Sequence, residues 1–136
     1  MAYQIKRRQR VQETLELCNA AGEVELSIDV DINVDEMGGR IANAQNVLAM
    51  AQELIAKEPE SEKAQEAFGS AVIAMFAVIF GKDNAHKLLT YYEARYTEML
   101  LDVLPFINEV VMPKVREASE ARKKQLLDAA NIMRRR

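Results

Sequence analysis

The sequence predicts a mainly α-helical protein with an N-terminal β-hairpin, an α+β fold built as a bundle of about four helices. A change in hydrophobic periodicity carries this prediction. Between residues 24 and 34 apolar residues fall at every second position, as on a half-buried strand, and after residue 35 they recur every three or four positions, as on a helix. Because 49% of the 136 residues are hydrophobic, we expect a single domain over residues 11–113.

The hairpin is expected over residues 11–34. A less regular alternation from Val11 to Cys18 supplies the first strand, and Asn19 and Gly22 suit the turn because both tolerate positive φ. An isolated hairpin is marginal in water, so its apolar face must pack on the helices or on another copy of the protein. The residues expected to mediate self-association are Val24, Leu26, Ile28 and Val30.

Helices are expected over residues 35–112. Asp35 is the expected cap of the first, which ends before Pro59, although two glycines favour a start nearer Arg40. Ser61 and Gly81 are expected to bound the second helix.

The third helix is expected to be capped by Asp83 or Asn84, and a long helical region follows from Tyr96. Pro105 and Pro113 each remove a helix hydrogen bond, so kinks or short breaks are expected at both.

The second helix becomes apolar on nearly all sides over residues 71–80. In a chain of this length we expect that the other helices do not cover it fully, so that a partner completes its burial. Residues 114–136 form a charged helix with a thin apolar stripe, expected to be mobile or to fold on a partner. The expected partner-binding residues are Phe68, Val72, Met75, Phe76, Ile79, Phe80, Leu126 and Met133.

Basic charge is concentrated at the two ends. The net charge is −3, and four basic residues in the arm 1–10 together with Arg134, Arg135 and Arg136 supply +7, which leaves −10 for the body. An acidic body repels phosphates, so nucleic acid is a disfavoured partner, yet a small DNA-binding or regulatory protein using its basic termini remains the alternative function.

No catalytic or cofactor motif is present in the sequence, and no cofactor is expected. His86 stands alone, Cys18 is expected to be a buried or half-buried thiol, and Asp29 with Asp31 continues a solvated row that includes Glu25. An enzyme would require a pocket that joins His86 to distant carboxylates. With a single cysteine, no expected leader peptide and no apolar run of membrane-spanning length, the expected location is the cytoplasm, without membrane association.

The order of these parts and the segment from Ala74 to Leu88, AMFAVIFGKDNAHKL, resemble the tail assembly chaperones of long-tailed, siphovirus-like bacteriophages and of prophages of Gram-positive bacteria. The resemblance covers roughly residues 15–111. It implies a non-enzymatic homo-oligomer of the host cytoplasm, absent from the mature virion, that shields the tape measure protein and helps recruit the tail tube protein.

Overall fold

The computed structural model describes residues 1–5 and 10–135 and confirms the predicted fold class. A two-stranded antiparallel hairpin is followed by helices that make up most of the chain. Of the expected basic arm, Lys6, Arg7 and Arg8 lie outside the described residues, as does Arg136 at the opposite end.

The hairpin pairs strand β1 (Val11–Cys18) with strand β2 (Val24–Ile32), and Leu15 lies opposite Ile28. The register is irregular after Leu17, where β2 carries one extra residue. One face of this ribbon packs on the helices and the other faces solvent, as the alternating pattern predicts.

Asn19 holds the turn of the hairpin. Its Oδ1 accepts hydrogen bonds from the backbone N–H groups of Ala21 and Glu23, each at 3.0 Å. Gly22 has a φ of 82°, a conformation in which other residues are strained. The predicted turn residues therefore form the turn.

Helix α1 (Val34–Lys57) begins immediately after β2. Asn33 is its N-cap and accepts a hydrogen bond at 3.1 Å from the N–H of Asp35, so the prediction that Asp35 caps the helix is wrong. The expected start near Arg40 is also wrong, because a good cap and an acidic first turn offset the weak helix propensity of the two glycines.

Helix α2 (Glu62–Phe80) has the predicted limits. The Ser61 hydroxyl oxygen accepts a hydrogen bond from the N–H of Ala64 at 3.3 Å. Gly81 ends the helix with a φ of 88°, and its N–H donates to the carbonyl of Ala77 at 3.0 Å.

Helix α3 (Lys82–Tyr91) starts directly after this glycine, so neither Asp83 nor Asn84 is its cap. Asn84 instead lies within the first turn and donates its side-chain amide to the carbonyls of Phe80, at 3.0 Å, and Asp29, at 3.2 Å. It thereby fixes β2 to the junction of α2 and α3.

From Tyr96 to Arg134 the chain is continuously helical, with α4 (Tyr96–Phe106), the π-helical turn η1 (Ile107–Val111) and α5 (Met112–Arg134). The predicted breaks at Pro105 and Pro113 are absent. The helix is instead irregular between the two prolines, where it widens into a π-helical turn. There the N–H of residue 112 donates to the carbonyl of residue 107, five positions earlier.

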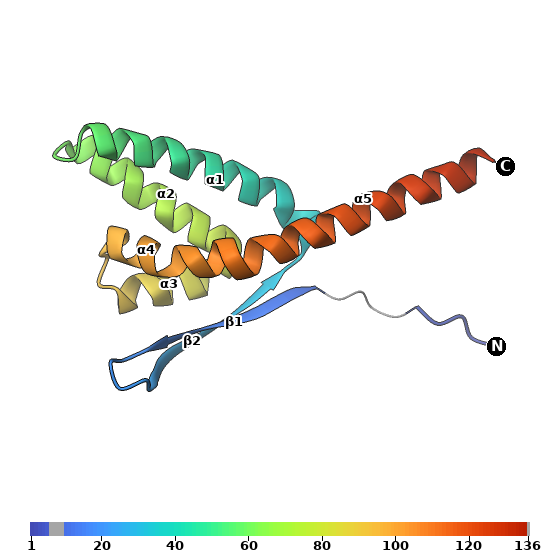
Figure 1. Ribbon diagram of the computed structural model, residues 1–136, viewed down its shortest axis with the longest axis horizontal. Helices are drawn as coiled ribbons and strands as arrows, with labels where there is room; N and C mark the ends of the chain where they lie inside the picture. The colour runs from blue at the N-terminus through green and yellow to red at the C-terminus, as the bar shows by residue number, and fades with distance from the viewer. Residues whose placement is uncertain (6–9, 136) are drawn as a thin grey trace.

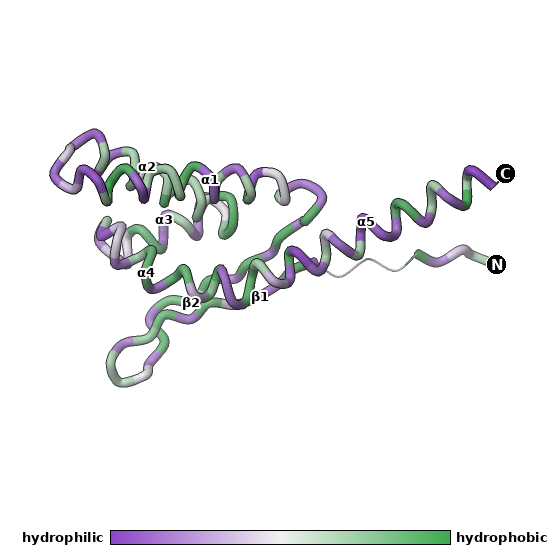
Figure 2. The backbone as a smooth tube through the Cα atoms, turned by 45° about the horizontal axis from the view of Figure 1, so that its top comes forward, coloured by the Kyte–Doolittle hydropathy of each residue, from purple (hydrophilic) through white to green (hydrophobic). Residues whose placement is uncertain are grey.

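The helices lie in layers around α2 (Figure 1). α1 runs beside α2, α3 and α4 lie on its other side, and the hairpin crosses beneath them. Gly69 of α2 lets the ring of Tyr96 approach closely, because a Cβ at this position would lie 2.9 Å from Cε2 of that ring. α5 starts in the body and then projects beyond it, with hydrophobic and hydrophilic residues alternating along its length (Figure 2).

Candidate partner-binding surface

The six expected partner-binding residues of α2 lie inside the chain's own core. Their exposed fractions range from 0% to 8%, and they contact α1, α3, α4 and β2 instead of solvent. The chain's own elements therefore cover these six residues, whereas Ile73, Ala77 and Val78 are only partly buried and Ala74 is exposed. The buried residues are Phe68, Val72, Met75, Phe76, Ile79 and Phe80.

Aromatic packing shows how this burial is completed. The rings of Phe76 and Phe80 meet edge to face with centroids 5.5 Å apart, and Phe80 stacks on Phe106 of α4 at 6.3 Å. α2 is long and apolar enough to cross a membrane by length and composition alone, but half of the relevant window is buried in the fold. Its apolar character is thus accounted for by its central position in the core.

The hairpin residues proposed for self-association are also largely internal. Ile28 and Val30 are buried, at 0% and 1% exposure, and Leu26 is partly buried against the helices. Val24, at 52%, remains accessible. The apolar face of the hairpin therefore packs on the helices of its own chain, which was one of the two expected outcomes.

The solvent face of the hairpin carries polar side chains with local partners. The Thr14 hydroxyl donates to Asp29 at 2.9 Å, and Arg10 forms an ion pair with Asp31 at 2.9 Å. This confirms a solvated strand face at Asp29 and Asp31. Glu25 is exposed as well, and its carboxylate accepts a hydrogen bond at 3.0 Å from the hydroxyl of Tyr91 on α3.

A groove of about 500 Å³ separates the hairpin tip from the turn between α3 and α4. Tyr92 donates its hydroxyl to Asp102 at 3.0 Å, and burial, reinforced by this carboxylate, raises the pKa of Tyr92 above its ordinary value. The hydrogen bond to Glu25 likewise raises the pKa of Tyr91. The first of these hydrogen bonds joins the end of α3 to α4, and the second joins the hairpin to α3.

The residues singled out for chemistry do not converge. Cys18 is exposed at the end of β1, where it lines the groove at the hairpin tip, so the expectation of a buried or half-buried thiol is wrong. His86 is exposed on α3. Across residues 1–5 and 10–135, no group of three His, Cys, Asp or Glu side chains is placed to hold a metal ion.

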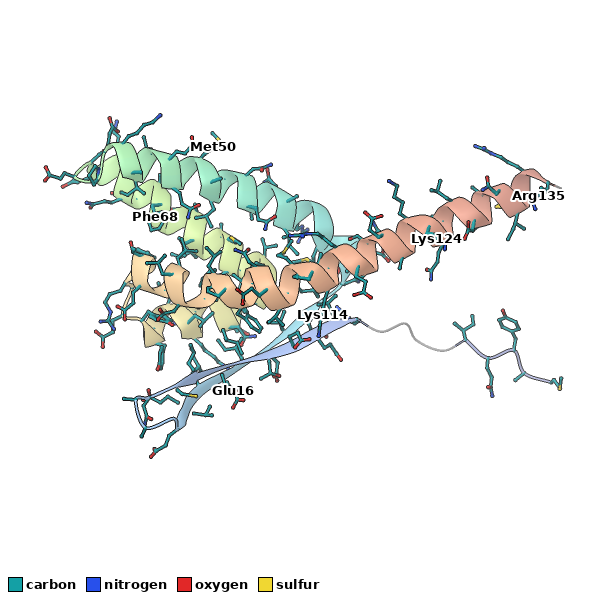
Figure 3. All side chains as sticks on the ribbon, viewed as in Figure 1. Glu16, Met50, Phe68, Lys114, Lys124 and Arg135 are labelled. Atoms are coloured by element: carbon teal, nitrogen blue, oxygen red, sulfur yellow. The ribbon has the colours of Figure 1, made fainter. Side chains whose placement is uncertain are left out.

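α5 carries the two remaining expected partner-binding residues, and both are accessible. Leu126 is 64% exposed and Met133 is 76% exposed. Both lie on the part of α5 that projects from the body, here called the α5 arm and comprising residues 119–134 (Figures 1 and 3). The arm does not lie over α2, so it does not act as a cover for that helix.

The first turns of α5 join this helix to the body. Val115 is buried, Lys114 pairs with Glu13 of β1, and Arg122 pairs with Asp35 at the start of α1. A groove of about 330 Å³ runs between α1 and α5 at this junction. Packing therefore continues past the boundary expected at residue 113 and ends near residue 122.

The apolar side of the arm continues the side of α5 that packs on the body. Val115, Ser119, Arg122, Leu126, Ala129 and Met133 follow one another at alternating spacings of four and three. The first turns of this face are covered by the fold, whereas the last turns are open to solvent.

Sequence reasoning missed several accessible apolar side chains. Leu127 and Ile132 on the arm are 57% and 60% exposed, and α1 presents Val47, Met50 and Leu54 to solvent. The three α1 residues are spaced by three and four positions and lie outside the buried stripe of this helix, which comprises Ile41, Ala44, Leu48 and Ala51. A count of apolar residues outside that stripe would have found them.

Comparison of the chain with protein-family models, with curated proteins and with solved structures finds no match. The surface has to be interpreted from its own physical chemistry and from the sequence motif.

Proposed function

We propose that this chain is a non-enzymatic tail assembly chaperone of a long-tailed bacteriophage or prophage, which binds and shields the tape measure protein and self-associates. The motif from Ala74 to Leu88 suggests this family. The observation that carries the binding function is the α5 arm, a charged helix that leaves the body with Leu126 and Met133 exposed.

The arm has the properties that a helix-binding surface requires. An apolar stripe on an amphipathic helix gains free energy when a second helix covers it, by about 25 cal/mol for each Å² of apolar surface removed from water. The exposed apolar side chains are flanked by Lys123, Lys124 and Arg134, which keep the uncovered arm soluble.

The client proposed for this surface is a long, helical and aggregation-prone protein, the tape measure protein, and a tail tube subunit is a possible second partner. Binding an exposed apolar segment lowers the concentration of free segment and hence its aggregation, so this activity requires no nucleotide. We place this activity in the host cytoplasm and outside the mature virion.

Co-expression with the tape measure protein of the same phage or prophage genome tests the proposal. Wild-type chain should keep the tape measure protein soluble and co-purify with it. Leu126→Glu combined with Met133→Glu should abolish both effects, because carboxylates would replace the apolar contacts of the arm.

Ala121→Glu combined with Asn131→Glu is the matched control, because it adds the same two negative charges to exposed positions outside the stripe of Leu126 and Met133. It should behave as wild type. If the control lost tape measure binding to the same extent, the change in net charge alone would explain the effect. If the tape measure protein stayed soluble with the variant changed at Leu126 and Met133, the client site would lie elsewhere.

A second candidate function is that of a small DNA-binding or regulatory protein. It is favoured by the basic charge at both ends of the sequence, where Lys6, Arg7, Arg8 and Arg10 precede β1 and Arg134, Arg135 and Arg136 end the chain. Retention on DNA that falls steeply with added salt would support this alternative.

A further inference from the structure

α1 has a second apolar stripe that the fold leaves open. Met50 is 71% exposed, Val47 is 46% exposed and Leu54 is 39% exposed. Their spacing places them on one side of α1, while the buried side faces α2. Met50 points away from the other helices (Figure 3).

The α1 stripe and the stripe of the α5 arm have matching dimensions. Val47 to Leu54 and Leu126 to Met133 each span seven positions, roughly 10 Å along a helix axis. The α1 stripe is narrow and bordered by polar residues, the form that suits a helix–helix contact. On the arm, Leu127 and Ile132 lie to either side of Leu126 and Met133 and widen the exposed apolar face.

The charges around the two stripes are complementary. Residues 114–136 carry eight basic and three acidic side chains, a net charge of +5. Residues 52–66, at the end of α1 and the start of α2, carry five acidic and two basic side chains, a net charge of −3, and all seven are exposed. Glu53 and Glu58 lie nearest in sequence to Leu54.

The two stripes cannot meet within one chain. α5 crosses α1 at the beginning of that helix, where Arg122 pairs with Asp35, and then runs away from the body. Val47 to Leu54 lie farther along α1, toward its other end (Figure 1). A contact between them therefore requires two copies.

We propose that the α5 arm of one copy docks on the exposed stripe of α1 in a second copy. Leu126 and Met133 pack against Val47, Met50 and Leu54, and the basic side chains of the arm lie beside the acidic end of α1. Because the contact joins two different surfaces, it is head-to-tail, and it builds a closed ring or an extended row of copies.

This contact involves no hairpin residue, and it does not depend on the identity of the client. It also uses the same arm surface as the proposed client, so a client helix and a neighbouring copy compete for Leu126 and Met133. Client binding to the arm then releases copies from one another.

Disulfide trapping with the full chain tests the docking. In a Cys18→Ser background, a Met50→Cys chain and a differently tagged Leu126→Cys chain are mixed and oxidised with copper phenanthroline. The heterodimer should form readily. Asn131→Cys, on the polar side of the arm, replaces Leu126→Cys as the matched control and should give little heterodimer.

Light scattering and sedimentation of the unoxidised chain provide the second measurement. Wild type should self-associate at tens of micromolar, and Met50→Glu or Leu126→Glu should each weaken the association about tenfold or more, because a carboxylate would be buried at the contact. Both side chains are exposed in the single chain, so circular dichroism should show an unchanged fold.

Three results would overturn the docking: a wild-type chain that stays monomeric, a Leu126→Cys homodimer that outcompetes the mixed species, or binding of the monomeric arm to phosphatidylglycerol vesicles that depends on Leu126. None of these measurements includes the tape measure protein. Failure of the docking and failure to bind the tape measure protein are therefore distinguishable.

Discussion

Tyr92 shows at the residue scale how a buried polar group is accommodated in this core. Its ring is 4% exposed at the end of α3, and its hydroxyl donates to Asp102 at 3.0 Å. Burial, and then the adjacent carboxylate, disfavour the phenolate, so the folded-state pKa of Tyr92 is raised well above the ordinary 10.0. The folded chain thus retains a proton at pH values where the unfolded chain loses it.

Alkaline pH is therefore expected to destabilise the protein through Tyr92. The stabilising contribution is fully present below pH 10, where Tyr92 is protonated in both states, and is lost as the pH rises above 10 toward the folded-state pKa. Tyr92→Phe should cost about 1 kcal/mol near pH 8, through loss of the hydrogen bond. It should also make the free energy of unfolding less sensitive to pH above 10.

Urea denaturation at pH 8 and at pH 11 measures this difference. Tyr3→Phe is the control, because Tyr3 is 91% exposed and should leave the pH dependence unchanged. If the free energy of unfolding of Tyr92→Phe fell with pH above 10 as steeply as that of the wild type, groups other than Tyr92 would cause the alkaline destabilisation.

Ile28 and Val24 lie on the same strand with opposite degrees of burial. Ile28→Lys would place an ammonium at a site of 0% exposure, which we expect to cost about 4 kcal/mol or more and to abolish cooperative unfolding. Val24→Lys, at 52% exposure, should leave the fold intact. Thermal unfolding followed by circular dichroism distinguishes the two variants. If Ile28→Lys stayed folded but formed smaller oligomers than the wild type, assembly through the hairpin would be supported instead.

At the element scale, α5 has two parts with different roles. Met112 and Val115 are buried and belong to the core, whereas the arm has its clearest tie to the body in the pair of Arg122 with Asp35. A partly exposed ion pair of this kind contributes up to about 1 kcal/mol. The arm therefore contributes little to the stability of its own fold.

Deletion of residues 119–136 should leave unfolding cooperative and lower the free energy of unfolding by about 1 kcal/mol. Differential scanning calorimetry provides the measurement. Deletion from Met112 onward is the matched comparison and should abolish the cooperative transition, because two buried apolar side chains are then lost. Loss of cooperativity in the shorter deletion would show that the arm is part of the core.

At the scale of the whole molecule, charge is separated along the long axis. Residues 11–33 carry six acidic and no basic side chains, while residues 114–136 carry a net charge of +5. Such a distribution favours head-to-tail association of like copies over uniform binding to a polyanion, because the acidic body repels phosphates.

The chain should consequently show little retention on duplex DNA, even near 50 mM salt. Binding measured by fluorescence anisotropy over a salt series decides this, with the deletion of residues 119–136 as the comparison. Tight binding with a steep negative dependence on salt, lost in the deletion, would favour the DNA-binding alternative.

Local features of the sequence determined the elements and most of their limits. Strict alternation in β2, the Asn19–Gly22 turn, the Ser61 cap and the Gly81 stop all predict what the structure shows. The misplaced start of α1 was a local error as well, since Asn33 has a better capping position than Asp35. Leu126 and Met133 were recognised because a thin stripe on a charged helix can be read from spacing alone.

Only the tertiary structure decided what covers each apolar surface. Periodicity reports which side of an element is apolar, but it does not show whether another part of the same chain lies against that side. The apolar sides of α2 and β2 therefore suggested partners, although α1, α3, α4 and the hairpin bury them, while the uncovered stripe of α1 went unnoticed. Burial depends on which distant segments pack together. The candidate surface therefore loses the buried residues of α2, keeps Leu126 and Met133 of α5, and gains the exposed stripe of α1.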